Sequence, residues 1–156
     1  ILQKNEIGTN WCLFRFYTSF ILYFGTVTNT FKKTERLKSL NAFKALFTAG
    51  QSTKHFPIRM VFIPWKNPDN VLTQAGFSVS KKRFKKAVDR NFIKRQMRES
   101  FRLNKNELLT ELQHSYAVLF IYLHHQNSPY TEIEAALKKC MIDLAKYDAD
   151  KMNSTE

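Results

Sequence analysis

Residues 77–102 read FSVSKKRFKKAVDRNFIKRQMRESFR, a short run of strand-forming residues that leads into a long basic stretch. Two sets of residues recur there at helical spacing, one apolar and one basic. The apolar residues that could dock on a sheet are Val88, Ile93, Met97 and Phe101. The basic residues that step by four along one side are Arg90, Lys94, Arg98 and Arg102. We therefore expect a strand over 75–79 and an amphipathic helix over 83–104 with one strongly basic side.

The positive charge of the chain is concentrated in this segment. The 156 residues include 25 Lys and Arg against 13 Asp and Glu, a net charge of +12. Residues 81–105 hold eleven of these bases and two acids, whereas residues 106–156 hold four bases and eight acids. Such a separation predicts one electropositive face and a polyanionic partner, with nucleic acid first and an anionic membrane second. The two cysteines, Cys12 and Cys140, exclude a disulfide framework and a four-cysteine zinc site.

The remaining segments predict a single α+β domain. A short helix is expected between Ser39, as its N-terminal cap, and Gly50, which would end it in a left-handed turn. Strand-forming residues follow over 56–63, and the apolar run 116–123 predicts a central strand buried on both faces. A last helix is expected from 128 to 147, followed by a frayed tail over 148–156. The order is α-β-β(-β)-α-β-α, which we interpret as a two-layer α/β sandwich.

The first thirty residues differ from the rest of the chain. The chain begins with Ile1 and its first methionine is Met60, so we expect a fragment or a reading frame that starts too far upstream. Residues 11–24 are apolar except for interruptions such as Arg15, and they are fewer than the roughly 20 that a spanning helix needs. We interpret residues 1–30 as an extension of the domain at 31–147. The alternative is a membrane-leaning segment.

The basic helix favours RNA over DNA as the partner. The sequence has no helix-turn-helix spacing, zinc-finger ligands or leucine heptads beside the helix. A compact α/β surface that contacts phosphates and recognises shape suits folded RNA. We therefore predict RNA partners and neither DNA nor membrane, in the cytoplasm.

At this point a specific resemblance emerges. The stretch 77–102 resembles the signature of the bacterial ribonuclease P protein component, an Arg-Asn-Arg run followed by Lys-Arg and Arg. The matching residues here are Arg90, Asn91, Lys94, Arg95 and Arg98, and the sequence departs at Phe92, where the family usually has arginine. Residues 36–50, 116–123 and the last helix match the family in order, so the resemblance covers roughly 31–147.

The resemblance implies a protein subunit of an enzyme whose catalyst is RNA and which removes the 5′ leader from precursor tRNA. It implies a ribosomal-protein-like fold with a left-handed β-α-β crossover, and binding of the catalytic RNA by the basic helix. The helix residues so assigned are Lys85, Lys86, Arg90, Asn91, Lys94, Arg95, Arg98 and Arg102. It also implies a cleft for the leader beside the first helix. Its expected residues are Phe43, Phe47, Phe62, Arg36, Lys44, Ser80, Lys81 and Lys82, although spacing alone also fits three ordinary core phenylalanines.

The acidic residues do not suggest a protein-borne active site. A two-metal nuclease needs clustered carboxylates. Residues 31–105 contain only Glu35, Asp69, Asp89 and Glu99, which are widely spaced. We therefore predict no catalytic residue, no metal ligand and no tightly bound cofactor, with Mg²⁺ held mainly by the RNA. The alternative function is that of a non-catalytic, ribosomal-type protein that binds structured RNA.

Overall fold

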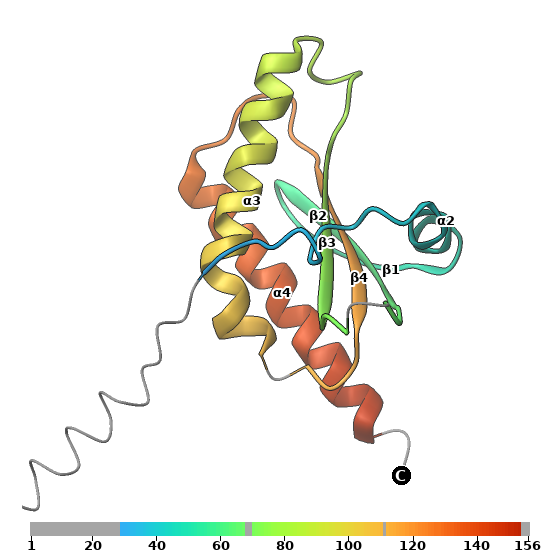
Figure 1. The fold of residues 1–156 in the computed structure, drawn as a ribbon. Coiled ribbons are helices and arrows are strands. Elements are labelled where there is room, and N and C mark those ends of the chain that lie inside the picture. Colours follow the sequence, from blue (N-terminus) through green and yellow to red (C-terminus); the bar gives the residue numbers. More distant parts are fainter. Residues whose placement is uncertain (1–28, 68–69, 111, 154–156) are drawn as a thin grey trace, which may run out of the picture.

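A computed structural model describes residues 29–67, 70–110 and 112–153 of the chain. The strands form one sheet in the order β1-β2-β4-β3 (Figure 1). The strand β4 pairs antiparallel with β2 and parallel with β3, and β1 pairs antiparallel with β2. In chain order the elements are α2 (Leu40–Ala49), β1 (Gln51–His55), β2 (Ile58–Pro64), β3 (Thr73–Val79), α3 (Ala87–Leu109), β4 (Tyr116–Tyr122) and α4 (Tyr130–Asn153).

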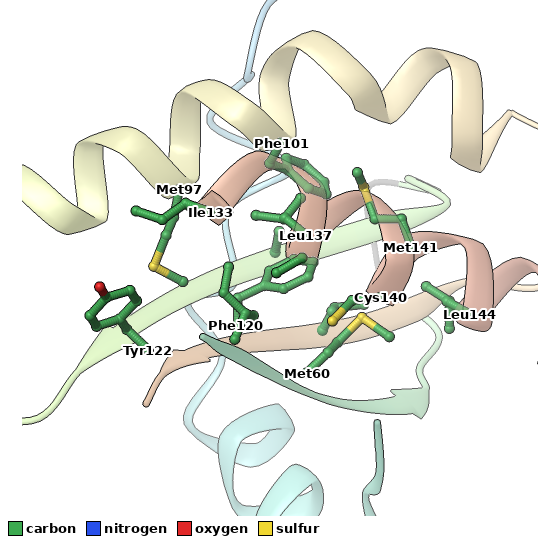
Figure 2. Close-up of a cluster of buried hydrophobic side chains, with 14 of the residues drawn as sticks. Met60, Met97, Phe101, Phe120, Tyr122, Ile133, Leu137, Cys140, Met141 and Leu144 are labelled. Carbon is green, nitrogen blue, oxygen red and sulfur yellow. The ribbon is translucent and has the colours of Figure 1, made fainter. Parts of the chain in front are cut away.

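Helices cover the two faces of the sheet unequally. The long helices α3 and α4 lie on one face, and the short helix α2 lies on the other (Figure 1). Alternation along β2 follows this division, because Met60 packs in the core below α3 and α4 while Val61 packs against α2. Figure 2 shows the larger core, in which side chains of α3, α4 and the sheet meet around Phe120. Burial on both faces explains why β4 is apolar almost throughout.

The parallel pairing of β3 with β4 makes the chain cross over between two neighbouring strands. The helix α3 lies within that crossover and packs on the sheet through Ile93, Met97 and Phe101. The expected α+β sandwich and its central strand are therefore confirmed. The hand of the crossover stays an implication of the family resemblance.

Two elements differ from the prediction in their residues. The optional third strand of the expected order is β1, but no residues were assigned to it because its sequence, QSTKH, is polar and lies at the edge of the sheet with three exposed residues. The helix α3 begins at Ala87 and ends at Leu109, four to five residues later than expected at each end. Val88 therefore lies in the first turn, where it is 76% exposed instead of docked on the sheet.

The end of α2 also differs from the prediction. Ser39 caps the helix as expected, and its hydroxyl accepts a hydrogen bond from the Ala42 N–H at 3.3 Å. Gly50, however, has φ −71° and ψ 135°, an extended conformation and not a left-handed turn. Glycine is needed here for space, because a Cβ atom would lie 2.2 Å from the Leu46 carbonyl oxygen and 2.7 Å from Val61 Cγ1.

The last helix is longer than expected. It starts at Tyr130, directly after Ser128 and Pro129, and continues to Asn153, so residues 148–153 are not a frayed tail. The helix is held there by Asp148, which is 2% exposed and accepts hydrogen bonds from the Gln113 N–H and the Tyr116 hydroxyl.

Two residues before the expected start of the domain at residue 31 also contact α3. The Arg102 guanidinium donates to the Asn29 carbonyl oxygen at 2.5 Å, and the Lys105 ammonium donates to the Thr30 carbonyl oxygen at 2.6 Å. Residues 29 and 30 are thus attached to α3. The apolar stretch at 11–24 lies outside the described residues. Within the described ranges, none of the helices combines the length and apolar content needed to cross a bilayer.

Candidate RNA interface

Arginine side chains fix the entrance to α3. The Arg90 guanidinium donates hydrogen bonds of 2.7 Å to the carbonyl oxygens of Phe84 and Lys85, in the loop that leads into the helix. Arg83 donates to the Leu123 carbonyl oxygen at the end of β4. No side chain caps the start of the helix at Lys86. The loop before the helix is therefore held by the hydrogen bonds of Arg83 and Arg90. Arg83 and Arg90 therefore have structural roles in the fold.

Two more bases are tied down near the other end of α3. Arg102 forms an ion pair with Glu99, in which Nε lies 3.0 Å from Oε2, and this bond lowers the pKa of Glu99 below its ordinary value. Lys105 forms an ion pair with Glu35 in addition to its bond with Thr30. Of the eleven bases between 81 and 105, four are thus engaged within the protein.

The side chains of the other seven bases of this segment make no hydrogen bond or ion pair with any part of the chain that the structure describes. Six are exposed and Lys94 is half-buried. They form what we call the α3 cation row, which runs from the end of β3 along the outer side of α3: Lys81, Lys82, Lys85, Lys86, Lys94, Arg95 and Arg98. Asn91 is exposed beside them. Of the eight helix residues predicted to bind RNA, the structure therefore leaves six available and engages Arg90 and Arg102 elsewhere.

A second surface lies over α2. Phe47 is 71% exposed and Leu40 is 77% exposed, while Phe43 between them is half-buried against the small core under α2. The spacing of these three residues puts them on one side of the helix, with Lys44 exposed next to them. We call this the α2 apolar face. Exposed rings of this kind can stack on unpaired nucleobases.

Two basic grooves lie on this face of the sheet, one beside the start of α2 and one beside β1 and β2. The first, of about 430 Å³, is lined by Arg36, Lys38, Lys66 and the ring of Trp65. The second, of about 480 Å³, has a different set of cations and rings, namely Lys54, Arg59, Arg83, Phe56 and His124. Phe56 packs edge-on against His124 with ring centroids 5.1 Å apart. Lys54 was missed as a site residue because no strand was assigned to residues 51–55. Phe56 was placed at the start of the expected strand over 56–63, whereas it lies in the turn before β2 and is 62% exposed.

Phe62 does not belong to this surface, and its assignment to a leader cleft was wrong. The ring is 4% exposed and lies on the opposite face of the sheet, where it packs edge-on against Tyr116 and Tyr147. Strand alternation explains the error, because Phe62 follows Val61, which is the residue that faces α2. Ser80, Lys81 and Lys82 lie in the turn after β3, next to Arg83 of the second groove.

The carboxylates serve the fold. Asp143 accepts hydrogen bonds from Thr53 Oγ1 at 2.7 Å and pairs with His55 Nε2 at 2.6 Å, which attaches α4 to the edge strand β1. Burial works to raise the pKa of Asp143, but its bonds with His55 and Thr53 outweigh burial and lower that pKa. Across residues 29–67, 70–110 and 112–153, no three His, Cys, Asp or Glu side chains gather as a metal site.

Comparison with known proteins identifies the family. The family model for ribonuclease P matches residues 31–145, most of the chain and nearly all of the described fold. The chain belongs to the ribonuclease P protein family. It is a protein subunit of the endoribonuclease ribonuclease P, which acts in the 5′ processing of tRNA, and the predicted family and function are confirmed.

Individual relatives agree with this assignment. The ribonuclease P protein component of Porphyromonas gingivalis is 32% identical over 116 residues, which cover 72% of this chain and 85% of the relative. That of Clostridium kluyveri is 34% identical over 114 residues, covering 72% of this chain and 96% of the relative. The solved ribonuclease P protein of Staphylococcus aureus aligns with a TM-score of 0.58 at 25% identity, covering 74% of this chain and 99% of that one.

Proposed function

We propose that the α3 cation row binds the RNA subunit of ribonuclease P. The observation that supports this is the set of seven basic side chains without a partner in the described structure, all within the turn after β3 and the first half of α3. Like charges at helical spacing repel each other by a few tenths of a kcal/mol per pair. A bound polyanion removes that cost, and the planar fork of Arg95 and Arg98 suits phosphate oxygens.

The α2 apolar face and its two flanking grooves are the second half of the proposal. Single-stranded RNA is bound where rings offer stacking surfaces and cations follow the backbone. Phe47 and Phe43 offer the rings, and Arg36, Lys44 and Arg59 offer the cations. We therefore assign the 5′ leader of precursor tRNA to this face. The two RNAs would then bind to surfaces that differ in chemistry as well as in position.

The protein's own contribution to cleavage is electrostatic and positional. Two folded RNAs repel each other, and a subunit with net charge +12 offsets part of that repulsion. Because the described carboxylates offer no ligand cluster, we assign no catalytic residue to the protein and place the Mg²⁺ ions of the holoenzyme mainly on RNA. We place this activity in the cytoplasm.

The α3 assignment is tested by a cleavage assay at limiting magnesium. The full chain is mixed with Porphyromonas gingivalis ribonuclease P RNA and a precursor tRNA. The double variant Arg95→Ala/Arg98→Ala is compared with Lys139→Ala/Lys146→Ala, which also removes two exposed positive charges but from α4. The α3 variant should lose stimulation of cleavage and affinity for the ribonuclease P RNA, and the α4 variant should keep both. Equal losses in the two variants would attribute the effect to net charge alone. RNA binding by the wild-type protein without stimulation of cleavage would favour the ribosomal-type alternative.

The leader assignment needs its own comparison. Phe47→Ala should weaken binding of a tRNA with a 5′ leader by the holoenzyme, by about 1–3 kcal/mol for one lost stack. Binding of the same tRNA without its leader should not change. A loss of equal size for both RNAs would contradict the placement of the leader on the α2 apolar face.

A further inference from the structure

Two apolar side chains project from the most basic part of the surface. Val88 is 76% exposed and Phe92 is 51% exposed, although both lie in the first turns of α3. They are four residues apart, so they are neighbours on one side of the helix. The residues that bury this helix, Ile93 and Met97, lie on the opposite side.

The surroundings of this pair are cationic. Lys85 and Lys86 precede Val88, and Arg95 follows Phe92 by three residues on the same side of the helix. The ring of Phe92 keeps about half of its surface open to solvent in these surroundings. Scattered exposed apolar residues are normal in proteins. A ring and a valine one turn apart, inside a row of cations without partners, form a composite surface that is apolar at its centre and basic at its rim.

That composite fits one class of ligand best. An uncharged apolar partner would leave the surrounding positive charges without compensation, whereas RNA offers apolar base faces next to phosphates. Sequence-specific contacts with RNA are made mainly to unpaired bases, which stack on aromatic rings. Stacking also does not require a hydrogen-bonding group, and phenylalanine has none.

We propose that Phe92, supported by Val88, is a stacking site for an unpaired base of the RNA subunit. The proposal rests on the proposed function, in that it requires the α3 cation row to bind that RNA. In the complex, Arg95 and its basic neighbours contact phosphates while Phe92 covers the face of the base between them. One end of α3 therefore binds RNA by an uncharged contact, whose strength does not depend on salt as the phosphate contacts do.

Salt dependence separates the two kinds of contact. The dissociation constant of the full chain for Porphyromonas gingivalis ribonuclease P RNA is measured over a range of salt concentrations. Phe92→Ala should weaken binding about 5- to 150-fold, the equivalent of about 1–3 kcal/mol per stacked base, with an unchanged slope against log salt. Phe92→Trp should retain affinity. Arg98→Ala should instead reduce the slope by about 0.7–0.9, because one phosphate contact is lost.

The control is Ile142→Ala, which truncates another exposed apolar residue, on α4, and should bind as the wild type does. Thermal unfolding of each variant checks the fold, which a half-exposed ring should affect little. Wild-type affinity of Phe92→Ala together with a reduced slope for Arg98→Ala would overturn the stacking site and leave the proposed function intact. An unchanged affinity and slope for Arg98→Ala and for Arg95→Ala would overturn the proposed binding of the RNA subunit by the α3 cation row. Loss of a protein dimer in Phe92→Ala without RNA would assign the surface to self-association and overturn the proposal.

Discussion

The Arg90 guanidinium lies 2.7 Å from the carbonyl oxygen of Phe84 and closes the loop between β3 and α3. A second bond of the same length, to the Lys85 carbonyl oxygen, completes the arrangement. This arginine belongs to the motif that resembles the ribonuclease P signature, and the resemblance implies that it binds RNA. In the structure its side chain instead holds the loop that connects the end of β3 to the start of α3.

Arg90→Ala should therefore act mainly on stability. The loss of two charge-assisted hydrogen bonds is expected to lower the free energy of unfolding by about 1.5–3 kcal/mol. The salt slope of RNA binding should stay near the wild-type value, because no phosphate contact is removed. Arg98→Ala is the matched control, with normal stability and a lower slope. A fall in slope for Arg90→Ala equal to that of the control would show that Arg90 contacts phosphate.

The two faces of the sheet predict opposite outcomes for two phenylalanines. Phe62→Ala removes a ring that is 4% exposed and should lower the free energy of unfolding by about 3–5 kcal/mol. Phe47→Ala removes a ring that is 71% exposed and should change stability by less than about 0.5 kcal/mol. Denaturant unfolding measures both. A stable Phe62→Ala variant would restore Phe62 as a candidate for RNA contact.

The hydrogen bonds that Asp148 accepts predict a specific loss of stability in acid. Burial works to raise the pKa of Asp148, but hydrogen bonds from the Gln113 N–H, His114 and Tyr116 outweigh burial and lower that pKa. A carboxylate whose pKa is lower in the folded state stabilises the fold above its unfolded pKa of about 3.9. That contribution is lost as the pH falls through the folded value.

The comparison is with Asp148→Asn, which should be less stable at neutral pH by about 1–3 kcal/mol, because an amide cannot replace a carboxylate that accepts several bonds. Its stability should also fall less steeply than that of the wild type as the pH drops below about 4, since the titrating group is gone. Chemical unfolding as a function of pH measures this difference. Parallel pH profiles for the two proteins would contradict a role of Asp148 in acid stability.

Gly50 and Gly76 offer a matched pair for close packing. In Gly50→Ala the new Cβ would meet the main-chain oxygen of Leu46 at 2.2 Å, and main chain cannot move aside cheaply. We expect a loss of about 1–3 kcal/mol in the free energy of unfolding. In Gly76→Ala the nearest atom is Leu119 Cδ1 at 3.1 Å, a side chain that can adjust, so the loss should be smaller. The reverse order in thermal unfolding would contradict this account of the end of α2.

The sequence by itself determined the features that depend on local periodicity and on composition. A nearly continuous apolar run predicted the central strand β4, and the spacing of Ile93, Met97 and Phe101 predicted the buried side of α3. The separation of bases from acids along the chain predicted a polyanionic partner, with nucleic acid first. These features are readable because a helix or a strand repeats its environment every few residues.

Only the tertiary structure decided which of the bases remain available and which face each ring occupies. Arg102 is engaged by the carbonyl oxygen of Asn29, 73 residues away, and no local spacing encodes such a contact. Phe62 and Phe47 look alike as sequence, but strand register buries Phe62 against Tyr147, whereas Phe47 projects from the outer side of α2. Register and long-range hydrogen bonds depend on how the elements pack together, and this packing separates the cations that hold the fold from those that are free to bind RNA.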